Sequence, residues 1–286
     1  MANLKEIRNR IASVKSTMQI TSAMKMVSAA KLKKAQDAIT AMRPYANKLT
    51  ELLQNLSGSL DGDVGTKYTD NREVKKVLVV SITSNRGLCG AFNSNIIKES
   101  VSLYHGKYDG KQVDYITIGK KGNDILAKKF NIISNESGVF DKLTFENVAA
   151  IAEDLMAKFT EGEYDRIDLV YNRFKNAATQ IVTTEQFLPI VPVEGDTNAS
   201  ADYIFEPSKP EIVEQLIPKS LKTQLYKAIR DSFASEHGAR MTAMHKATDN
   251  AGELKDQLTL TYNKARQAAI TGEILEIVGG AEALND

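Results

Sequence analysis

Residues 4 to 56 read LKEIRNRIASVKSTMQITSAMKMVSAAKLKKAQDAITAMRPYANKLTELLQNL, with an apolar residue at almost every third or fourth position. With Leu4 as heptad position a, thirteen of the sixteen a and d positions are apolar. A straight α-helix drifts by about 20° per heptad from a seven-residue repeat. A stripe that keeps one register over this length therefore predicts a coiled coil and not a globular helix.

Two features interrupt this stripe. Thr21, Lys25 and Ser28 occupy seam positions in a stretch where methionines alternate with lysines. We expect the helix to face outward there and to offer an adaptable contact surface, with a stutter and a solvated lysine face as the alternative. Pro44 removes the hydrogen bond to Thr40, so a kink or an interruption is expected at that point.

The C-terminal end has a second long helical stretch, because residues 219 to 278 contain no proline. Read in heptads from Met244, its predicted seam positions are Ala247, Ala251, Leu254, Leu258, Thr261, Ala265 and Ala268. Most of these side chains are small, so two helix backbones can approach closely. Each terminal helix is too long and too polar to stand alone, and the segment between them returns the chain. The sequence therefore predicts an antiparallel pair.

The middle of the chain alternates strand-like and helix-like segments. The predicted strands are 74–81, 113–118, 166–174 and 180–190, and the predicted helices are 93–104, 122–130 and 145–160. This alternation is typical of a partly parallel sheet, and the last two strands resemble an antiparallel hairpin at one edge. The predicted fold class is α/β, with a long antiparallel coiled coil and a Rossmann-like α/β domain that contains a mixed sheet.

The predicted organisation has four parts. They are an N-terminal coiled-coil helix (1–57), a linker (58–73), an α/β domain (74–206) and a C-terminal coiled-coil helix (207–286). Within the α/β part, residues 194–202 are expected to form a loop.

The charge is uneven along the chain. The net charge is +1, so bulk electrostatics favours neither nucleic acid nor membrane as a partner. Residues 1–50, however, hold ten Lys or Arg and two acids, which predicts an acidic partner for that end. The single cysteine excludes an internal disulfide and fits a reducing compartment. The N-terminus lacks the apolar core of a signal peptide, and no stretch approaches the roughly 18 apolar residues of a membrane span. Membrane association is therefore expected to be peripheral.

The segment SNRGLCG, residues 84–90, is the first candidate for chemistry. It lacks the glycine patterns that cradle a dinucleotide or a triphosphate. A nucleophilic Cys89 needs a base, yet His105, His237 and His245 are distant in sequence. We favour a tight turn, and keep an α/β enzyme with a Cys89 nucleophile as an alternative.

Other candidates are weaker. Lys120 and Lys121 lie at a strand-to-helix turn that resembles an anion site, although such lysines are usually only exposed. His245 and Asp249 share a helix face without a third metal ligand nearby. We expect no catalytic site, no metal and no cofactor. A basic coiled-coil protein that binds nucleic acid remains a second alternative.

Several segments resemble a known family. They are LKEIRNRIASVKSTMQITSAMKMVSAAKL (4–32), RPYA (43–46), SNRGLCGAFNSN (84–95), SEHGARMTAMHKATDNA (235–251) and YNKARQAAITGEILEIVGGAEAL (262–284). In order and spacing they are similar to the gamma subunit of the F-type rotary ATP synthase, of the bacterial type. The chain departs from this family at Asn85, where an acidic residue is usual, and at Ala91, where glycine is usual. It has no insertion with a cysteine pair, so the thiol regulation of the chloroplast branch is not expected.

The resemblance implies a non-catalytic rotor. It implies that the paired terminal helices turn inside a hexamer of alpha and beta subunits, while the α/β domain is a foot on the epsilon subunit and the membrane c ring. Proton flow through the ring would then drive ATP synthesis on beta. The implied location is the cytoplasmic face of the bacterial inner membrane, peripheral to the bilayer, with no nucleic acid partner.

The resemblance also implies contact residues. Met24, Lys25 and Arg240 are expected near an acidic loop of beta, Arg266, Gln267 and Thr271 at a second contact with beta, and Tyr203 and Glu206 at the foot. The local positive charge adds Lys31, Lys33 and Lys34 to the first contact, and the 84–90 turn adds Arg86.

Overall fold

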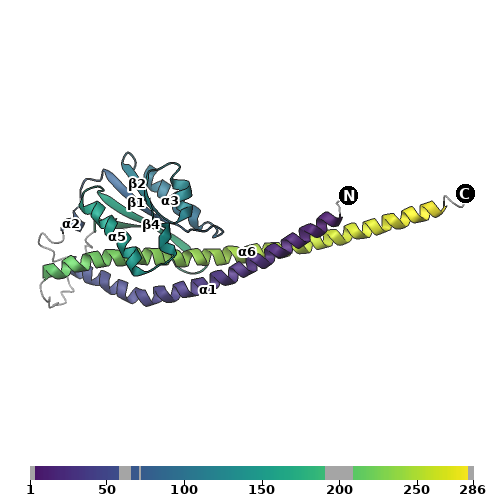
Figure 1. The fold of residues 1–286 in the computed structure, drawn as a ribbon, viewed down its shortest axis with the longest axis horizontal. Coiled ribbons are helices and arrows are strands. Elements are labelled where there is room, and N and C mark those ends of the chain that lie inside the picture. The colour runs from purple at the N-terminus through teal and green to yellow at the C-terminus, as the bar shows by residue number, and fades with distance from the viewer. Residues whose placement is uncertain (1–3, 58–65, 71, 191–208, 283–286) are drawn as a thin grey trace. The chain divides into compact units, whose positions relative to one another are not determined.

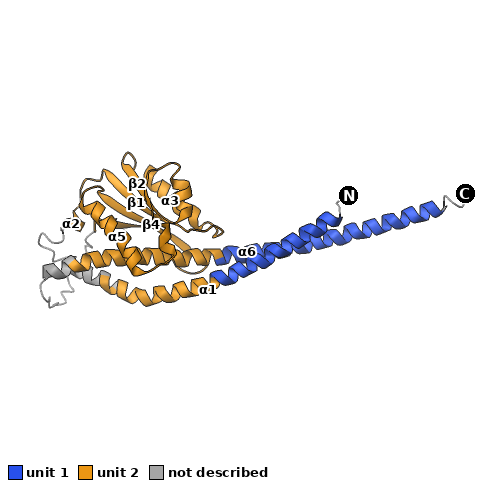
Figure 2. Cartoon of the chain, in the orientation of Figure 1, with its two compact units in different colours: residues 1–28, 241–286 blue, residues 29–240 orange. Residues whose placement is uncertain are grey.

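The computed structural model describes residues 4–57, 66–70, 72–190 and 209–282. These residues form two compact units (Figure 2). One unit, Ala29–Arg240, contains the sheet and the adjoining parts of both long helices. The other comprises Met1–Ser28 and Met241–Asp286, the two ends of the chain.

The sheet has five strands, in the order β3-β2-β1-β4-β5. The strands are β1 (Lys76–Ile82), β2 (Gln112–Ile118), β3 (Ile132–Asn135), β4 (Arg166–Phe174) and β5 (Gln180–Leu188). The first four run parallel, and β5 pairs antiparallel with β4 at one edge. The prediction of a mixed sheet with an edge hairpin is confirmed. Sequence analysis missed β3, whose four residues are too few to show a clear period.

Helices cover both faces of the sheet (Figure 1). The shorter helices are α2 (Thr66–Thr69), α3 (Phe92–His105), α4 (Lys120–Leu126), α5 (Phe145–Thr160) and the 3-10 helix η1 (Ser137–Phe140). Val77 and Val79 of β1 pack in a core with α3 and α4, whereas Leu78, Val80 and Ile82 pack in a core with α5. This division follows from the two-residue period of a strand. The short helix α2 lies within the predicted linker, most of whose other residues fall outside the described part of the chain.

The C-terminal helix is also part of the sheet domain's core. The helix α6 (Lys209–Glu282) contributes five buried residues to the cluster on the α5 face: Ile217, Leu221, Leu225, Ala228 and Ile229. Among the described residues, that buried cluster contains none from α1. The sequence did not predict this second role for α6, because its apolar residues were assigned only to the coiled coil.

Both long helices pass through a proline. α1 (Leu4–Ser57) is continuous through Pro44, and α6 is continuous through Pro218. The expected interruption at Pro44 is therefore wrong. Pro44 is exposed, while Ile39 before it and Ala46 after it are buried. Burial of the seam on both sides of the proline offsets the loss of one backbone hydrogen bond.

The seam of α1 keeps the predicted register. Every a and d position from Leu4 to Leu49 is buried or half-buried. The expectation that the helix faces outward at its polar seam positions is wrong for Thr21 and Ser28, which are 9% and 3% exposed. Thr248 of α6 donates a 2.8 Å hydrogen bond to the Thr21 hydroxyl, and Ser28 donates to the carbonyl of Met24. Small hydroxyl side chains can sit in a seam when they find such partners.

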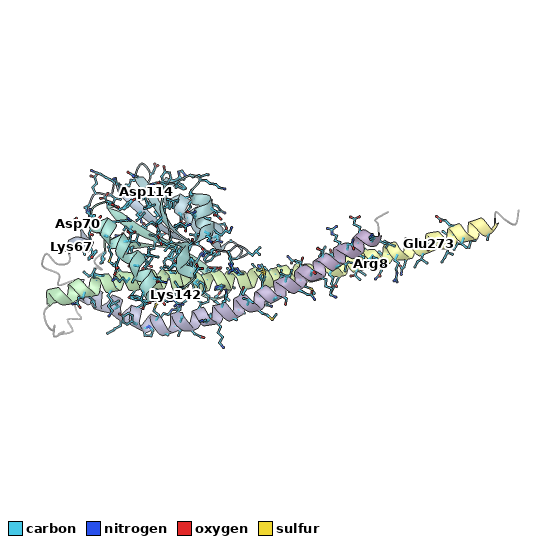
Figure 3. All side chains as sticks on the ribbon, viewed as in Figure 1. Arg8, Lys67, Asp70, Asp114, Lys142 and Glu273 are labelled. Atoms are coloured by element: carbon cyan, nitrogen blue, oxygen red, sulfur yellow. The ribbon has the colours of Figure 1, made fainter. Side chains whose placement is uncertain are left out.

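Three of the seven predicted seam positions of α6 are displaced by one residue. The buried and half-buried positions from Met244 onward are Met244, Ala247, Thr248, Ala251, Gly252, Lys255, Leu258, Tyr262, Ala265, Ala269 and Gly272. Ala247, Ala251, Leu258 and Ala265 are correct, whereas Leu254, Thr261 and Ala268 are exposed. The seam instead uses Thr248 and Tyr262, polar residues that pair with α1. Arg8, which is labelled in Figure 3, lies on α1. It donates a 2.7 Å hydrogen bond to the Tyr262 hydroxyl, and its guanidinium lies 5.7 Å from the Tyr262 ring centroid.

The C-terminal end of α6 extends beyond the N-terminus of α1 (Figure 1). The pairs Arg8–Tyr262 and Thr21–Thr248 place Leu4 opposite a point about four residues after Tyr262. The helix then continues to Glu282, which at 1.5 Å per residue adds roughly 24 Å of single helix. We call residues 267–282 the overhang. Ile274, Leu275 and Ile277 on it are at least half exposed.

None of the described helices combines the length and the apolar character that crossing a membrane requires.

Candidate functional site

The turn between β1 and α3 carries the segment that sequence analysis singled out. Leu88 and Gly90 both adopt the left-handed backbone region, with φ of 61° and 59°. A non-glycine residue costs about 1 kcal/mol or more there. Leu88 is also 65% exposed. The prediction of a tight turn is confirmed, and its strained residue is Leu88.

Cys89 points into the protein from this turn. Its side chain is 1% exposed and packs with Phe92 and with Ala239 of α6. Asn93 Nδ2 lies 3.2 Å from the sulfur, and the Ser84 hydroxyl lies 3.8 Å from it. Burial raises the pKa of the thiol above its ordinary value, so the reactive thiolate is disfavoured at neutral pH. This environment is that of a packing residue and not of a nucleophile.

We therefore expect Cys89→Ser to leave ATP hydrolysis and proton pumping by the assembled complex within about two-fold of wild type. Serine is nearly isosteric, and its hydroxyl can use the same two polar neighbours, so the turn keeps its shape. The measurement is both rates in membrane vesicles. Loss of hydrolysis in a variant complex of normal composition would show that the thiol itself has a chemical role.

Arg240 of α6 forms hydrogen bonds to the turn between β1 and α3. Its Nη2 donates to the carbonyls of Arg86 and Gly87 at 3.1 and 3.3 Å, and its Nε donates to Gly87 at 3.3 Å. Its Nη1 forms a 2.7 Å ion pair with Glu236. The residue is 7% exposed. A buried guanidinium that bridges two carbonyls and a carboxylate fixes their geometry, because its donors are coplanar.

His237 completes this cluster. Burial is the main cause that lowers its pKa to about 4, and the charges of Arg240 and Lys31 lower it further. The ring is therefore neutral at pH 7, and its Nδ1 accepts from Arg240 Nη1 at 3.3 Å. Its Nε2 has no hydrogen-bond partner among the described residues. Burial raises the pKa of Glu236, and Arg240 opposes this shift.

Asn85 stands where an acidic residue is usual in the family, and both ends of its amide form hydrogen bonds. Its Oδ1 accepts from the backbone of Lys120 at 3.1 Å, and its Nδ2 donates to the carbonyl of Ser137 at 2.9 Å. A carboxylate cannot make the second bond, so the amide joins three loops that an acidic residue would not join in this way.

At the start of α4, where the sequence suggested an anion site, the backbone N–H groups already bond to side chains of the protein. Asn85 accepts from Lys120 N, and Thr83 Oγ1 accepts from Gly122 N at 2.9 Å. Gly119 and Gly122 both lie against Thr83, so close that a Cβ at either would meet it below 3.0 Å. The backbone donors that would bind an anion are occupied.

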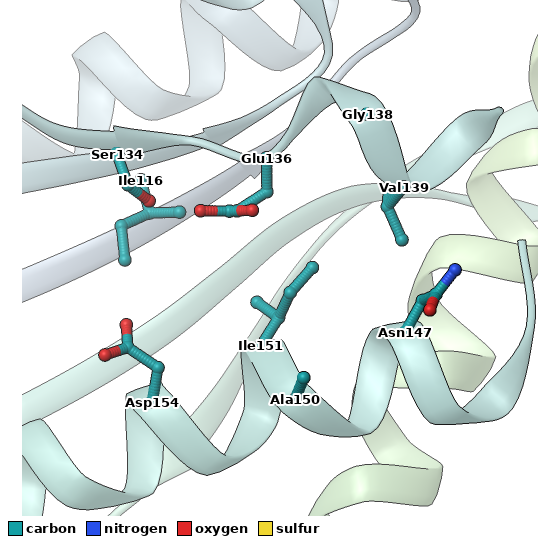
Figure 4. A pocket seen from close by; sticks show the side chains of 9 residues that line it. All are labelled: Ile116, Ser134, Glu136, Gly138, Val139, Asn147, Ala150, Ile151 and Asp154. Atoms are coloured by element: carbon teal, nitrogen blue, oxygen red, sulfur yellow. The ribbon is translucent and has the colours of Figure 1, made fainter. Parts of the chain in front are cut away.

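A cavity of about 400 Å³ lies between η1 and α5, next to the end of β3 (Figure 4). Ile116, Val139 and Ile151 form its apolar lining, while Glu136 and Asp154 approach it from opposite sides. Asp154 is already paired with Lys158 at 3.3 Å. The lining contains no histidine or cysteine.

No group of three metal-binding side chains occurs in the part of the chain that the structure describes. His245 pairs with Asp249 at 3.2 Å, but both side chains are more than half exposed. This pair is an i,i+4 contact on a solvent-facing helix.

The predicted contact residues fall into three groups. Lys31, Lys33, Lys34, Arg86, Arg266, Gln267 and Thr271 are exposed. Met24 and Lys25 are half-buried, and Arg240 is buried in the cluster described above. Tyr203 and Glu206 lie outside the described residues. Sequence analysis did not predict the cluster of Glu236 and His237 around Arg240, because Arg240 is fixed by carbonyls about 150 positions earlier in the chain. It considered His237 only as a base for Cys89, and it did not predict the left-handed backbone of Leu88.

Asp231 is a buried carboxylate on α6 with an unusual environment. It is 3% exposed, and its Oδ1 has no hydrogen-bond partner among the described residues. Burial is the main cause that raises its pKa from 3.8 to about 6, and Glu185 adds to this rise. Arg43, Lys227 and Arg173 oppose it.

This raised pKa has a consequence for stability. The charged carboxylate costs stability that is absent below about pH 3, grows as the pH rises from the ordinary pKa of 3.8 to the raised pKa of about 6, and is constant above that value. We expect Asp231→Asn to stabilise the chain by roughly 1 to 3 kcal/mol at pH 8 and by about a third of that at pH 4.5. The measurement is thermal unfolding at both pH values, with the exposed Asp37→Asn as the control. A variant less stable than wild type at pH 8 would contradict this.

The comparisons with known proteins agree on one family. A family model described as ATP synthase matches residues 3–284. The "ATP synthase gamma chain" of Flavobacterium psychrophilum is 76% identical over 285 residues, which are 99% of each chain. That of Flavobacterium johnsoniae is 76% identical over 286 residues, which are 100% of each chain.

Solved structures give the same result. A chain of the Tetrahymena thermophila mitochondrial ATP synthase, in a structure of its central stalk and c ring, is 28% identical with a TM-score of 0.61. The match covers 80% of this chain and 99% of that one. A chain of the Euglena gracilis mitochondrial enzyme shares the fold, with a TM-score of 0.69, 24% identity and coverage of 98% and 94%.

The fold and these matches define a non-catalytic central-stalk subunit of an ATP synthase, in which catalysis occurs on the beta subunits. The chain belongs to the ATP synthase gamma chain family. The sequence-based prediction of family and fold class is confirmed. The alternatives of a Cys89 enzyme and of a nucleic-acid-binding coiled coil are not supported.

Proposed function

We propose that the chain is the rotor that couples proton flow through a membrane c ring to ATP synthesis or hydrolysis on beta, by turning inside a hexamer of alpha and beta subunits. The observation that carries this proposal is the antiparallel pair of helices that ends in a single-helix overhang with exposed apolar side chains. An exposed apolar surface of this kind requires a surrounding partner. Family membership identifies that partner as the hexamer.

In this proposal the helices 1–57 and 207–286 form the shaft, residues 74–206 form the foot, and residues 58–73 link them. The foot binds the epsilon subunit and the c ring, with Tyr203 and Glu206 as contact residues. The chain is thereby peripheral to the membrane, on the cytoplasmic face of the bacterial inner membrane. No cofactor is required by this role.

The proposed contact with the acidic loop of beta involves the basic part of the chain. Its residues are Met24, Lys25, Lys31, Lys33, Lys34, Arg86 and Arg240. Exposure of the three lysines after Ala30 and of Arg86 supports their part in this contact. Arg240 is buried and bonded to the 86–88 turn, so its contribution passes through the turn that it holds.

A second contact with beta is proposed on the last part of α6, at Arg266, Gln267 and Thr271. All three are exposed; Arg266 lies directly before the overhang, and Gln267 and Thr271 lie on it. Thr271 Oγ1 donates to the carbonyl of Gln267 at 3.0 Å, which leaves the amide of Gln267 and the guanidinium of Arg266 on the surface of the helix.

The test is complementation in membrane vesicles from cells that lack this chain. We expect no ATP-driven proton uptake without it, and uptake in proportion to ATP hydrolysis once the chain is supplied. A variant truncated before Arg266 should assemble poorly or pump with a lower ratio of protons to ATP. Full coupling in vesicles without the chain would overturn the proposal.

A further inference from the structure

The segment 230–240 of α6 is tied to the sheet domain by side chains that donate to main-chain carbonyls. Arg230 Nη2 donates to Leu143 O at 3.0 Å, in the loop before α5. The Ser235 hydroxyl donates to Asn172 O at 3.0 Å, in the middle of the sheet. A main-chain carbonyl within a strand cannot change rotamer, so such a tie fixes a helix more firmly than a pair of exposed side chains does.

The backbone of α6 also lies directly against the hairpin between β4 and β5. A Cβ at Gly238 would lie 3.1 Å from the carbonyl oxygen of Ala177 and 3.2 Å from its Cα. Any larger residue at this position would force the helix and the hairpin apart by a few tenths of an ångström. The contact prevents the helix from rolling toward the hairpin.

Arg240 is the last residue of the segment 230–240 and forms a further contact with the sheet domain. Its coplanar donors reach the carbonyls of Arg86 and Gly87 on one side and Glu236 on the other. Residues 234–240 are all buried. The sheet domain therefore holds α6 through β4, through the β4–β5 hairpin and through the β1–α3 turn.

We propose that these contacts, which we call the α6 tie (Arg230, Ser235, Gly238 and Arg240), transmit torque from the foot into the shaft, and that Arg240 is the positioning residue that prevents slip between them. The inference rests on the proposed function of the chain as a rotor. The proposal assigns the transmission of torque to α6 and not to α1. The buried cluster that joins the sheet to the helix contains residues of α6 and, within the described residues, none of α1.

The test compares coupling in whole ATP synthase in membrane vesicles. In Ser235→Ala/Arg240→Lys the cation beside Glu236 is kept, but the bonds to three main-chain carbonyls, those of Arg86, Gly87 and Asn172, are weakened or lost. We expect the ratio of proton uptake to ATP hydrolysis to fall at least two-fold. The fall should increase as the proton gradient builds up, because the load on the tie increases. The matched control is Ser102→Ala/Arg173→Lys, which changes two exposed residues of the same unit and should keep the wild-type ratio.

A disulfide between the sheet domain and α6 distinguishes slip at the α6 tie from a general structural defect. Cys89 and Ala239 belong to one packing cluster, so Ala239→Cys places a second thiol in that cluster, and oxidation is used to join the two thiols across the tie. In the Ser235→Ala/Arg240→Lys background, oxidation should restore the ratio, and reduction should lower it again. A thiol count before and after oxidation shows whether the bond has formed.

The proposal is overturned if the double variant assembles and keeps the wild-type ratio under load, or if the ratio is low but the same in oxidised and reduced forms. If the double variant does not assemble, the ratio of Arg240→Lys alone decides in the same way. The proposed function is tested separately, by whether vesicles pump protons only when the chain is present. A negative result for the α6 tie therefore does not contradict the proposed function.

Discussion

A chain that carries Ile39→Asp is expected to be less stable than wild type by about 4 kcal/mol or more. Ile39 occupies an a position of α1 and is 3% exposed. A carboxylate there loses its hydration without gaining a fixed partner, which is among the most destabilising changes that a single residue can make. The measurement is the midpoint of urea unfolding of the full chain, followed by the helical circular dichroism signal.

Two further variants make this result specific. Ile39→Ala adds no charge and should cost about 2 to 4 kcal/mol, through lost burial and a cavity. Thr40→Asp places the same charge on the neighbouring exposed position and should cost well under 1 kcal/mol. If Ile39→Asp and Thr40→Asp unfold at the same urea concentration, Ile39 does not lie in a buried seam.

Reversal of four lysines to glutamate, at Lys25, Lys31, Lys33 and Lys34, is expected to weaken coupling strongly. A single exposed ion pair contributes only about 0 to 1 kcal/mol, so one reversal should have little effect. Four reversals place like charges against the proposed acidic loop of beta, within the Debye length of about 8 Å at physiological salt. The ratio of proton pumping to hydrolysis should fall, and raising the salt concentration should partly restore it.

The control for this experiment reverses four exposed lysines of the sheet domain, at Lys98, Lys128, Lys129 and Lys175. It changes the net charge equally but leaves the proposed contact intact. Both variant chains should fold when isolated, as shown by an unchanged circular dichroism spectrum. Equal ratios in the two variants at low and high salt would mean that the lysines of α1 are only a solvated face.

The part of the fold that sequence could predict is the part with a strong period. The stripe from Leu4 to Leu49 keeps its predicted register, because burial of one helix face depends on local spacing, although its polar members Thr21 and Ser28 were expected to face outward. The seam of α6 was wrong at three of seven positions, and Thr248 and Tyr262 enter it through bonds to particular residues of α1. A pattern that counts only apolar residues cannot include such positions.

The site was less predictable than the fold. The glycines around Cys89 indicated a turn, but the strain at Leu88 has no signal in composition. The role of Arg240 depends on carbonyls more than 150 residues earlier in the chain. Main-chain acceptors occur at every position, so no motif marks the two that a given arginine will reach. The resemblance to the gamma subunit family pointed to Arg240, but it did not predict that this residue is buried.

Single-molecule rotation tests the central claim most directly. An Asp109→Cys/Cys89→Ser chain carries one exposed thiol, on a turn of the sheet domain, and no buried one. With a hexamer of alpha and beta subunits fixed to a surface and a bead attached to this thiol, the account predicts that the bead turns in one direction when ATP is added and stops when ATP is removed. A bead that stays at a fixed angle while the same complexes hydrolyse ATP would contradict it.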